Sequence, residues 1–206
     1  MKDQQFAKLV VFVNSLVPLA VLGWDATHEQ LGANPAESAL HTTGNLAIIF
    51  LLLSLAITPL RKVTGKNYFS LFRKMLGLYA FFYACAHLGI YYVFYASLDL
   101  RKFMAAMVSN KFIILGLSSV LMMLPLALTS TNGSIKRLGA AKWKTLHTLA
   151  YPAAIAAVAH FWMSQKRDTT DPKIAAAVLF VLLAYRLIKR KSSAPRAVLP
   201  AKAVSS

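Results

Sequence analysis

The sequence predicts an all-α, polytopic membrane protein, a six-helix transmembrane bundle with both termini in the cytoplasm. Three observations predict this class. Of the 206 residues, 57% are apolar and only 15% are charged, which is too apolar for an ordinary soluble domain. Apolar runs close to the ~20 residues that a membrane-spanning helix needs recur along the chain. Basic residues gather in alternate connecting segments, as the positive-inside rule expects of a membrane protein.

The apolar runs define six expected helices. They cover roughly 6–24, 41–60, 75–97, 112–128, 145–163 and 174–188. The first run could instead be a cleaved signal peptide, but residues 20–25 form a poor small-residue cleavage site and the run is long. We therefore expect it to be the first helix of one transmembrane domain, residues 1–191.

Residues 192–206 differ in composition from the rest of the chain. Small residues and proline dominate this segment, which therefore has too little apolar surface to bury in a core. We expect it to be a disordered cytoplasmic tail.

Basic residues separate the two sides of the expected bundle. With six spans, 17 of the 23 Lys and Arg residues fall on the side of the termini, whereas six of the seven Asp and Glu residues fall on the other side. This asymmetry places both termini in the cytoplasm. The net charge of +16 therefore reflects topology and contact with membrane lipid. No basic patch interleaved with aromatic residues is left over, so we expect no nucleic-acid partner.

Several missing motifs limit the chemistry. The sequence has no G-x-G-x-x-G, no G-x-x-x-x-G-K-[ST] and no H-E-x-x-H, which argues against a nucleotide site and a metalloprotease site. Cys85 is the only cysteine, which excludes a disulfide framework, a cysteine zinc site and a cluster held by four thiolates. Without C-x-x-C-H, a covalently attached c-type haem is excluded as well.

Three histidines, His87, His147 and His160, lie within the expected helices. Ionisable side chains at that depth are costly, and they usually serve as ligands, proton relays or counter-ions. His87 and His160 fall at a similar level, in the outer halves of the third and fifth helices. Neutral imidazoles on two helices can hold a b-type haem without covalent attachment. These two residues are therefore the candidate axial ligands.

His147 and Arg73 mark a candidate inner site near the cytoplasmic surface. His147 precedes His160 by 13 residues, roughly 20 Å along a helix, which suits two sites stacked across one membrane. A uniform helix would place these two side chains about 140° apart, although Pro152 between them could alter the winding. Arg73 could pair with a haem propionate or a phosphate, or could simply anchor the third helix at the inner surface.

Other side chains near these sites have two interpretations each. His41 could touch an outer haem edge, a quinone head group or only water, and we expect solvent contact; His28 is expected to be solvated. The aromatic residues around His87 could line a flat cofactor pocket or face lipid. They are Tyr79, Phe81, Phe82, Tyr83, Tyr91 and Tyr92.

Short motifs occur in a fixed order along the chain. The motifs are Leu-Gly-Ala-Asn-Pro (31–35), His-Thr-Thr-Gly (41–44), Ile-Thr-Pro-Leu (57–60), Arg-Lys-Met-Leu-Gly-Leu (73–78), Leu-Thr-Ser-Thr (128–131) and Leu-Gly-x3-Trp-x2-Leu-His (138–147), followed by Tyr151 and His160. Each motif alone is weak, but together their order and spacing are specific and cover nearly the whole chain. In this order they resemble the MsrQ family of haem-binding membrane subunits, within the ferric-reductase-like transmembrane superfamily.

The resemblance implies transmembrane electron transfer through b-type haem in the bacterial inner membrane. It implies electrons from the quinone pool or a cytoplasmic flavin reductase, and delivery to a periplasmic molybdopterin-containing methionine sulfoxide reductase subunit that repairs oxidised proteins. It makes His87 and His160 axial ligands and His147 a ligand or close neighbour of a second, inner redox group. FMN is implied as an additional cofactor without an assigned site. The superfamily often has four histidines in two pairs, and with three here the sequence allows one haem or two.

Two other functions fit part of the sequence. A small proton-coupled transporter could use the intramembrane histidines to shuttle protons. A membrane anchor without a redox role would leave three buried histidines unexplained. Electron transfer by a subunit that is not itself catalytic is therefore the leading hypothesis.

Overall fold

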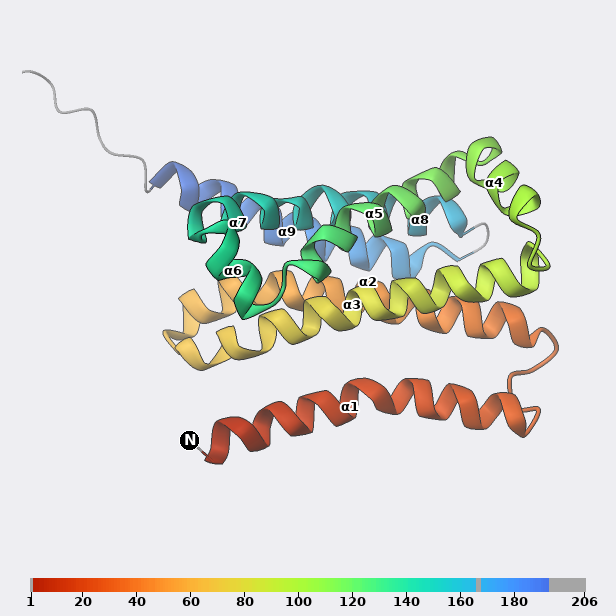
Figure 1. Ribbon diagram of the computed structural model, residues 1–206, viewed down its shortest axis with the longest axis horizontal. Helices are drawn as coiled ribbons and strands as arrows, with labels where there is room; N and C mark the ends of the chain where they lie inside the picture. Colours follow the sequence, from red (N-terminus) through yellow and green to blue (C-terminus); the bar gives the residue numbers. More distant parts are fainter. Residues whose placement is uncertain (1, 166–167, 193–206) are drawn as a thin grey trace, which may run out of the picture.

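Long helices lying side by side dominate the computed structural model, which describes residues 2–165 and 168–192 (Figure 1). They are α1 (Lys2–Thr27), α2 (Pro35–Thr64), α3 (Ser70–Ile90), α5 (Lys111–Leu128), α8 (Ala150–Ser164) and α9 (Thr170–Ser192). Shorter helices cover the ends, with α4 (Leu100–Ser109) at one end and α6 (Asn132–Leu138) and α7 (Ala140–Leu146) at the other. The described residues include no strand, so the all-α class is confirmed.

Four of the described helical segments are long and apolar enough to cross a membrane. They are Gln4–Thr27, Pro35–Thr64, Asn67–Tyr95 and Lys111–Leu128, and they contain the first four expected runs or nearly all of them. The third segment joins three pieces, the 3-10 turn η1 (Asn67–Phe69), α3 and the π-helical turn η2 (Tyr91–Tyr95). The total of six spans and the cytoplasmic location of the termini stay predictions.

The last two expected runs correspond to other helices. The run 145–163 is divided among the end of α7, a 3-10 turn η3 (His147–Leu149) and α8, and the run 174–188 lies within α9. Of the expected tail, only Ser192 is described, as the last residue of α9; residues 193–206 lie outside the described part of the chain.

The connecting segments fall at two opposite ends of the bundle. The α1–α2 connection and α4 lie at one end, while α6 and α7 lie at the other (Figure 1). Segments that the sequence assigned to opposite sides of a membrane therefore lie at opposite ends of the structure. Hereafter "outer" and "inner" denote these ends according to the predicted topology.

The ends of α2 are set by local chemistry. Asn34 caps its N-terminus by accepting a hydrogen bond from the backbone N–H of Glu37, and Pro35 occupies the first turn, where its missing N–H costs nothing. At the other end Gly65 adopts a φ of 69°, a left-handed conformation that ends helices at glycine. The result is a helix of 30 residues along one wall of the bundle.

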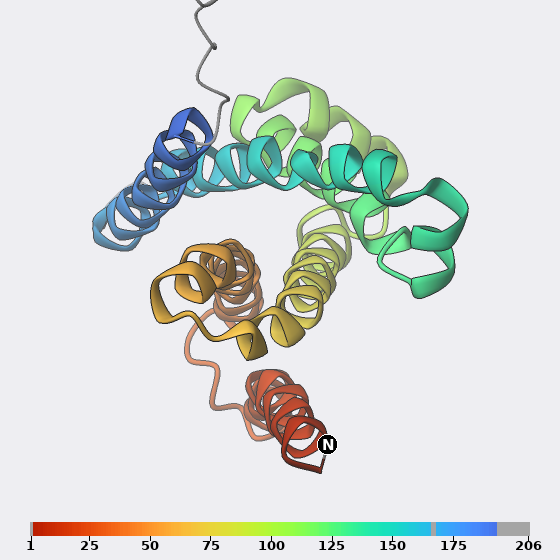
Figure 2. The same cartoon turned by 90° about the vertical axis from the view of Figure 1, so that its left-hand side faces the viewer.

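Two helix pairs form the frame of the bundle. α2 packs most extensively against α3, and α5 packs most extensively against α8. Small residues let α5 and α8 approach closely, because Ala153 and Ala154 are fully buried and Ser119 donates a hydrogen bond to the Ala153 carbonyl at 2.9 Å. In the end-on view of Figure 2 the α2–α3 pair lies between α1 and the α5–α8 pair.

α1 is held to this frame by two tyrosines of α3. The Tyr79 hydroxyl donates to the Phe12 carbonyl at 2.9 Å, and the Tyr83 hydroxyl donates to the Ser15 carbonyl at 2.7 Å. Tyr83 is fully buried and stacks on Phe50 of α2. These tyrosines therefore join helices, and they do not line a cofactor pocket as one interpretation of the sequence allowed.

Candidate functional site

His87 of α3 and His160 of α8 face each other across one cavity. Their ring centroids lie 6.1 Å apart, with the ring planes at 83°. A metal–imidazole nitrogen bond is about 2 Å long, so two imidazoles bound to opposite sides of one ion have centroids about 6 Å apart. The structure thus brings together the two residues that the sequence predicted as axial ligands, at a separation suited to one iron.

Both rings are fixed through the same nitrogen. Nδ1 of His87 donates to the Leu40 carbonyl at 3.0 Å, and Nδ1 of His160 donates to the Phe112 carbonyl at 2.6 Å. A carbonyl oxygen only accepts hydrogen bonds, so Nδ1 carries the proton in each neutral ring. The lone pair of each Nε2 is then left for a metal, an arrangement that orients metal-binding histidines in many proteins.

A glycine lies under each ring. A Cβ atom built on Gly44 would lie 2.9 Å from Nδ1 of His87, and one built on Gly116 would lie 2.9 Å from Nδ1 of His160. Each glycine follows by four residues the residue whose carbonyl accepts the hydrogen bond, Leu40 in α2 and Phe112 in α5. Glycine has no side chain at this position, one helical turn after the acceptor residue. Each imidazole ring can therefore approach the helix closely enough to reach the backbone carbonyl.

The cavity between the rings is large and mostly apolar. Its volume is about 410 Å³, and it is lined by α2, α3, α5 and α8 with contributions from η2 and α4. Apolar lining residues include Leu51, Ala84, Leu88, Ile113, Val120, Met123 and Ala157. No Lys or Arg of the described residues lines it. We call it the outer cavity, and its size and lining suit a flat apolar cofactor.

The ligand set favours haem over a bare metal ion. Within the described part of the chain, no group of three or more His, Cys, Asp or Glu side chains could hold a metal. A pair of imidazoles leaves a bare ion short of ligands, whereas a porphyrin supplies the remaining nitrogens itself. The residues present therefore fit a b-type haem.

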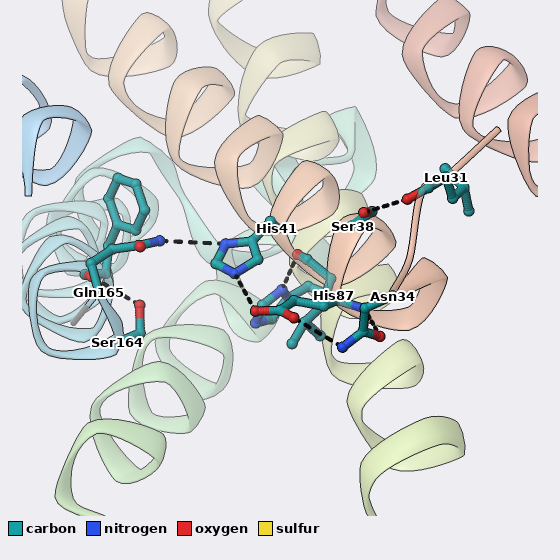
Figure 3. A network of polar contacts seen from close by, with 10 residues as sticks. Leu31, Asn34, Ser38, His41, His87, Ser164 and Gln165 are labelled. Carbon is teal, nitrogen blue, oxygen red and sulfur yellow. Dashed lines mark hydrogen bonds and ion pairs between the residues drawn. The ribbon is translucent and has the colours of Figure 1, made fainter. Parts of the chain in front are cut away.

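Polar contacts join three side chains that line the outer cavity, Glu37, His41 and Gln165 (Figure 3). The Gln165 amide nitrogen lies 3.4 Å from Nδ1 of His41, and Nε2 of His41 lies 3.8 Å from Oε1 of Glu37. All three side chains line the cavity. The His41 side chain is 46% exposed, which agrees with the expected solvent contact, and it also borders the cofactor cavity.

A second cavity of about 280 Å³ lies toward the inner end. Its lining includes Arg73, Lys74, Ser130, Trp143 and His147, and we call it the inner cavity. The structure thus brings Arg73 and His147 together, as the sequence predicted for an inner site. It does not bring His147 to the outer cavity, because His147 is absent from that lining.

His147 has a nitrogen available for a ligand. Its Nδ1 donates to the Trp143 carbonyl at 3.1 Å, and its ring stacks on the Trp143 ring at 3.8 Å. Nε2 is buried and has no hydrogen-bond partner among the described residues. A buried acceptor without a partner costs free energy, so we expect a metal or a hydrogen-bond donor to bind this nitrogen.

The angular offset between His147 and His160 is altered by η3. Residues His147–Leu149 form a 3-10 turn, which winds at 3.0 residues per turn, so the uniform-helix estimate does not apply. Pro152 follows in the first turn of α8, where proline is tolerated. The change in winding therefore lies just before Pro152, at a turn that the sequence did not reveal.

Two arginines lie at or near the inner cavity, and neither forms an ion pair with a carboxylate among the described residues. In the described ranges no carboxylate lies within ion-pair distance of Arg73. Arg186 of α9 is held nearby, donating to Oγ1 of Thr58 at 3.0 Å and lying 4.5 Å above the ring of Tyr151. A guanidinium group without a carboxylate partner, such as that of Arg73, favours an anionic ligand.

Several site residues were not found from the sequence. Leu40 and Phe112 carry no chemical signal of their own, because their backbone carbonyls bind His87 and His160 irrespective of the side chain. The available signal was a glycine within each apolar run, at Gly44 and Gly116, since an interior glycine often marks close approach of another group.

Comparison with known proteins gives matches over most of the chain. The family described as ferric reductase like transmembrane component matches residues 43–158, a range that includes His87 and His147. Proteins named protein-methionine-sulfoxide reductase heme-binding subunit MsrQ are similar. The one from Xanthomonas euvesicatoria pv. vesicatoria is 42% identical over 197 residues, covering 91% of this chain and 88% of the relative. Those from Herminiimonas arsenicoxydans and Rhodospirillum rubrum are each 39% identical, covering 87% and 91% of this chain and 84% and 91% of the relatives.

Proposed function

This chain belongs to the MsrQ family of methionine sulfoxide reductase heme-binding subunits, and from that membership we propose that it conducts electrons across the bacterial inner membrane. The proposed acceptor is a periplasmic, molybdopterin-containing subunit that reduces methionine sulfoxide in oxidised proteins. The proposed donor is the quinone pool or a cytoplasmic flavin reductase. The observation that carries the proposal is the pair of imidazoles, His87 and His160, on either side of an apolar cavity.

His87 and His160 are proposed to hold one b-type haem in the outer cavity. When bound, haem supplies reversible one-electron transfer at this position. The protein contributes two neutral imidazoles, each fixed by a carbonyl on a neighbouring helix, and an apolar lining that limits access of water. Hydrogen bonds to Nδ1 raise the basicity of a ligating histidine, so Leu40 and Phe112 also help to set the potential of the site.

His147 and Arg73 are proposed to hold a second redox group in the inner cavity, a second haem b or FMN. The buried Nε2 of His147 supplies a ligand or an acceptor. Arg73 and Lys74 supply positive charge for the propionates of a haem or the phosphate of FMN. This location lies toward the end of the bundle where a cytoplasmic or membrane donor would deliver electrons.

The two cavities are separated by a thin layer of side chains. Leu51 of α2 and Met123 of α5 line both cavities, and each is nearly buried. Groups held in the two cavities would therefore lie close together along the bundle. Stacking of this kind supports electron conduction across the membrane better than it supports a proton-coupled transporter, which needs a path open to each side in turn.

The experiment that tests the function uses the purified protein in liposomes. We expect a b-type absorption spectrum that is reduced by a quinol, or by NADH with a flavin reductase, and reoxidised when the periplasmic subunit and methionine sulfoxide are added. His87→Ala protein is the control and should show neither change. A stable but colourless preparation from haem-replete cells, or a spectrum that the periplasmic subunit leaves unchanged, would overturn the proposal.

A further inference from the structure

Three arginines from different helices gather at the inner end of the bundle. Arg61 lies near the end of α2, Arg73 near the start of α3 and Arg186 near the end of α9, and these helix ends lie at the same end of the bundle (Figure 1). Each of the three residues is partly buried. Arg73 interacts electrostatically with both Arg61 and Arg186, and like charges repel each other. A partly buried group of this kind favours the binding of an anion.

One face of α2 sets this arrangement. Ser54, Thr58 and Arg61 are spaced by four and three residues, so they lie on the same face of the helix. The Ser54 hydroxyl donates to the Arg73 carbonyl at 3.0 Å, which places the start of α3 beside this face. Arg186 donates to Oγ1 of Thr58 at 3.0 Å, which places the end of α9 beside it as well. The arginines therefore meet through side-chain contacts between helices.

The neighbouring sequence supplies no counter-ion. None of the seven Asp and Glu residues lies in 38–98 or after residue 171, and in the described part of the chain none of the three arginines forms an ion pair. Arg73 lines the inner cavity and so can contact the redox group proposed there, whereas Arg61 and Arg186 are absent from that lining. These two guanidinium groups therefore need an anion from outside the described residues.

Arg186 and Thr58 are already oriented for such an anion. The Arg186 guanidinium lies 4.5 Å above the Tyr151 ring and donates to Thr58 through one nitrogen, which leaves it further N–H donors. Oγ1 of Thr58 accepts that bond, so the hydroxyl proton can be donated to a ligand. Arg61, one turn after Thr58, supplies a second planar fork. Forks of this geometry match the oxygen atoms of a phosphate group.

The surroundings favour a phosphate that is carried by a lipid. Apolar side chains adjacent in sequence to Arg61 and Arg186 are exposed; they are Leu60, Val63, Leu187 and Ile188. In a membrane, such side chains contact acyl chains, while basic side chains at the helix ends reach the head groups. Basic sites between helices near the cytoplasmic surface bind anionic lipid head groups in other membrane proteins.

We propose that Arg61, Thr58 and Arg186 form a binding site for the phosphate of an anionic phospholipid, between α2 and α9 at the inner end. This inference goes beyond the proposed electron transfer and does not depend on it. The bound head group neutralises two guanidinium groups and joins α9 to α2. Phosphatidylglycerol, which has a net negative charge, binds more tightly than phosphatidylcholine, whose choline cation is repelled by the arginines.

The test measures lipid affinity directly. Full-length protein, delipidated in a non-ionic detergent, is titrated with phosphatidylglycerol and with phosphatidylcholine. Native mass spectrometry counts the bound lipids, and the rise in the thermal unfolding midpoint gives the Kd. We expect wild type to bind phosphatidylglycerol saturably and to prefer it to phosphatidylcholine. Arg61→Gln and Arg186→Gln should each weaken this binding about tenfold to hundredfold, the effect of losing hydrogen bonds to a charged group.

Further variants separate recognition from charge and from folding. Arg137→Gln removes the same charge from an exposed residue of α6 at the same end, and it should leave the Kd unchanged. Arg186→Lys keeps the charge without the planar fork and should retain part of the affinity. Thr58→Val keeps the shape of the side chain and both arginines, and should still weaken binding. The unfolding midpoint without lipid shows whether each variant is folded.

Three results would overturn the lipid site. The first is equal affinity of wild type for the two lipids, and the second is a Kd for phosphatidylglycerol that the Arg61 and Arg186 variants share with wild type. The third comes from titration with FMN and with inorganic phosphate. If either of these binds through Arg61 and Arg186 while phosphatidylglycerol does not, the phosphate belongs to a soluble ligand.

Discussion

Gly44 and Gly116 hold the same relation to the two histidines of the outer cavity. A Cβ on either would lie 2.9 Å from Nδ1 of the adjacent ring, and in each case the carbonyl four residues earlier accepts the Nδ1 proton. The α2–α3 pair and the α5–α8 pair therefore hold their histidines in the same way, with a carbonyl that binds Nδ1 and a glycine four residues later. Two copies of this arrangement, facing each other, line the cavity proposed to hold haem.

Alanine at Gly44 or Gly116 should displace the ring beside it. The contact leaves no room for a methyl group, and overpacking of this kind costs about 1–3 kcal/mol. We expect Gly44→Ala and Gly116→Ala each to lower haem content and the thermal unfolding midpoint, measured by absorbance and by circular dichroism. Gly23→Ala, where nothing lies within 4 Å of the added Cβ, is the control. Normal haem content in both cavity variants would contradict the close contact.

Removal of each histidine should affect a particular cavity. His87→Ala and His160→Ala should abolish most haem binding in the outer cavity, because each removes one of the two proposed axial ligands. His147→Ala should spare the outer site, since His147 lines only the inner cavity. Haem per protein by pyridine haemochrome is the measurement. If His147→Ala leaves the haem content unchanged, the inner cavity holds no haem that depends on His147.

Substitutions of Leu51 or Met123 are expected to affect both cavities, because both side chains line the outer and the inner cavity. Met123→Ala should connect the two cavities. It should also destabilise the protein by about 2–5 kcal/mol, the usual cost of a large-to-small change in a core. Met123→Leu conserves volume and should cost less than about 1.5 kcal/mol. Leu121→Ala on the same helix is the control, because Leu121 is 56% exposed. Thermal unfolding measures stability, and redox titration shows whether the potentials at both sites shift together.

Much of this arrangement follows from the sequence for physical reasons. Membrane helices are long and uniformly apolar, so the all-α class and the positions of the main helices could be predicted. His87, His147, His160 and Arg73 could be predicted as well, because ionisable side chains within such runs are rare and costly.

The partners of these residues could not be predicted, because they depend on how helices that are distant in the sequence pack together. The carbonyls of Leu40 and Phe112 act through backbone atoms, which no residue type reveals, and the Gln165–His41 contact joins residues 124 apart in the chain. The 3-10 turn at His147–Leu149 was equally hidden, since a periodicity argument assumes uniform winding. Local patterns therefore indicated which residues matter, whereas their partners required the packed structure.

Arg73 should determine the affinity of the inner cavity for an anionic cofactor. Arg73→Leu removes a cation that has no carboxylate partner among the described residues, so we expect the inner group to be lost while the outer haem remains. Arg73→Lys keeps the charge but not the planar fork and should retain part of the binding. Pyridine haemochrome and the fluorescence of acid-released flavin together identify the group. Lys62→Ala, an exposed change at the same end, should alter neither.

The predicted topology can be tested with single cysteines. Cys85 is the only native cysteine, so a Cys85→Ser background is free of thiols. His28→Cys lies in the connection between α1 and α2, and Lys136→Cys lies in α6, at the opposite end of the bundle. Because basic residues are retained in the cytoplasm, a membrane-impermeant maleimide should label the residue 28 variant in intact spheroplasts. It should label the residue 136 variant only after permeabilisation. The reverse pattern would invert the protein, and would place the histidine pair on the cytoplasmic side and the Arg73 cavity on the periplasmic side.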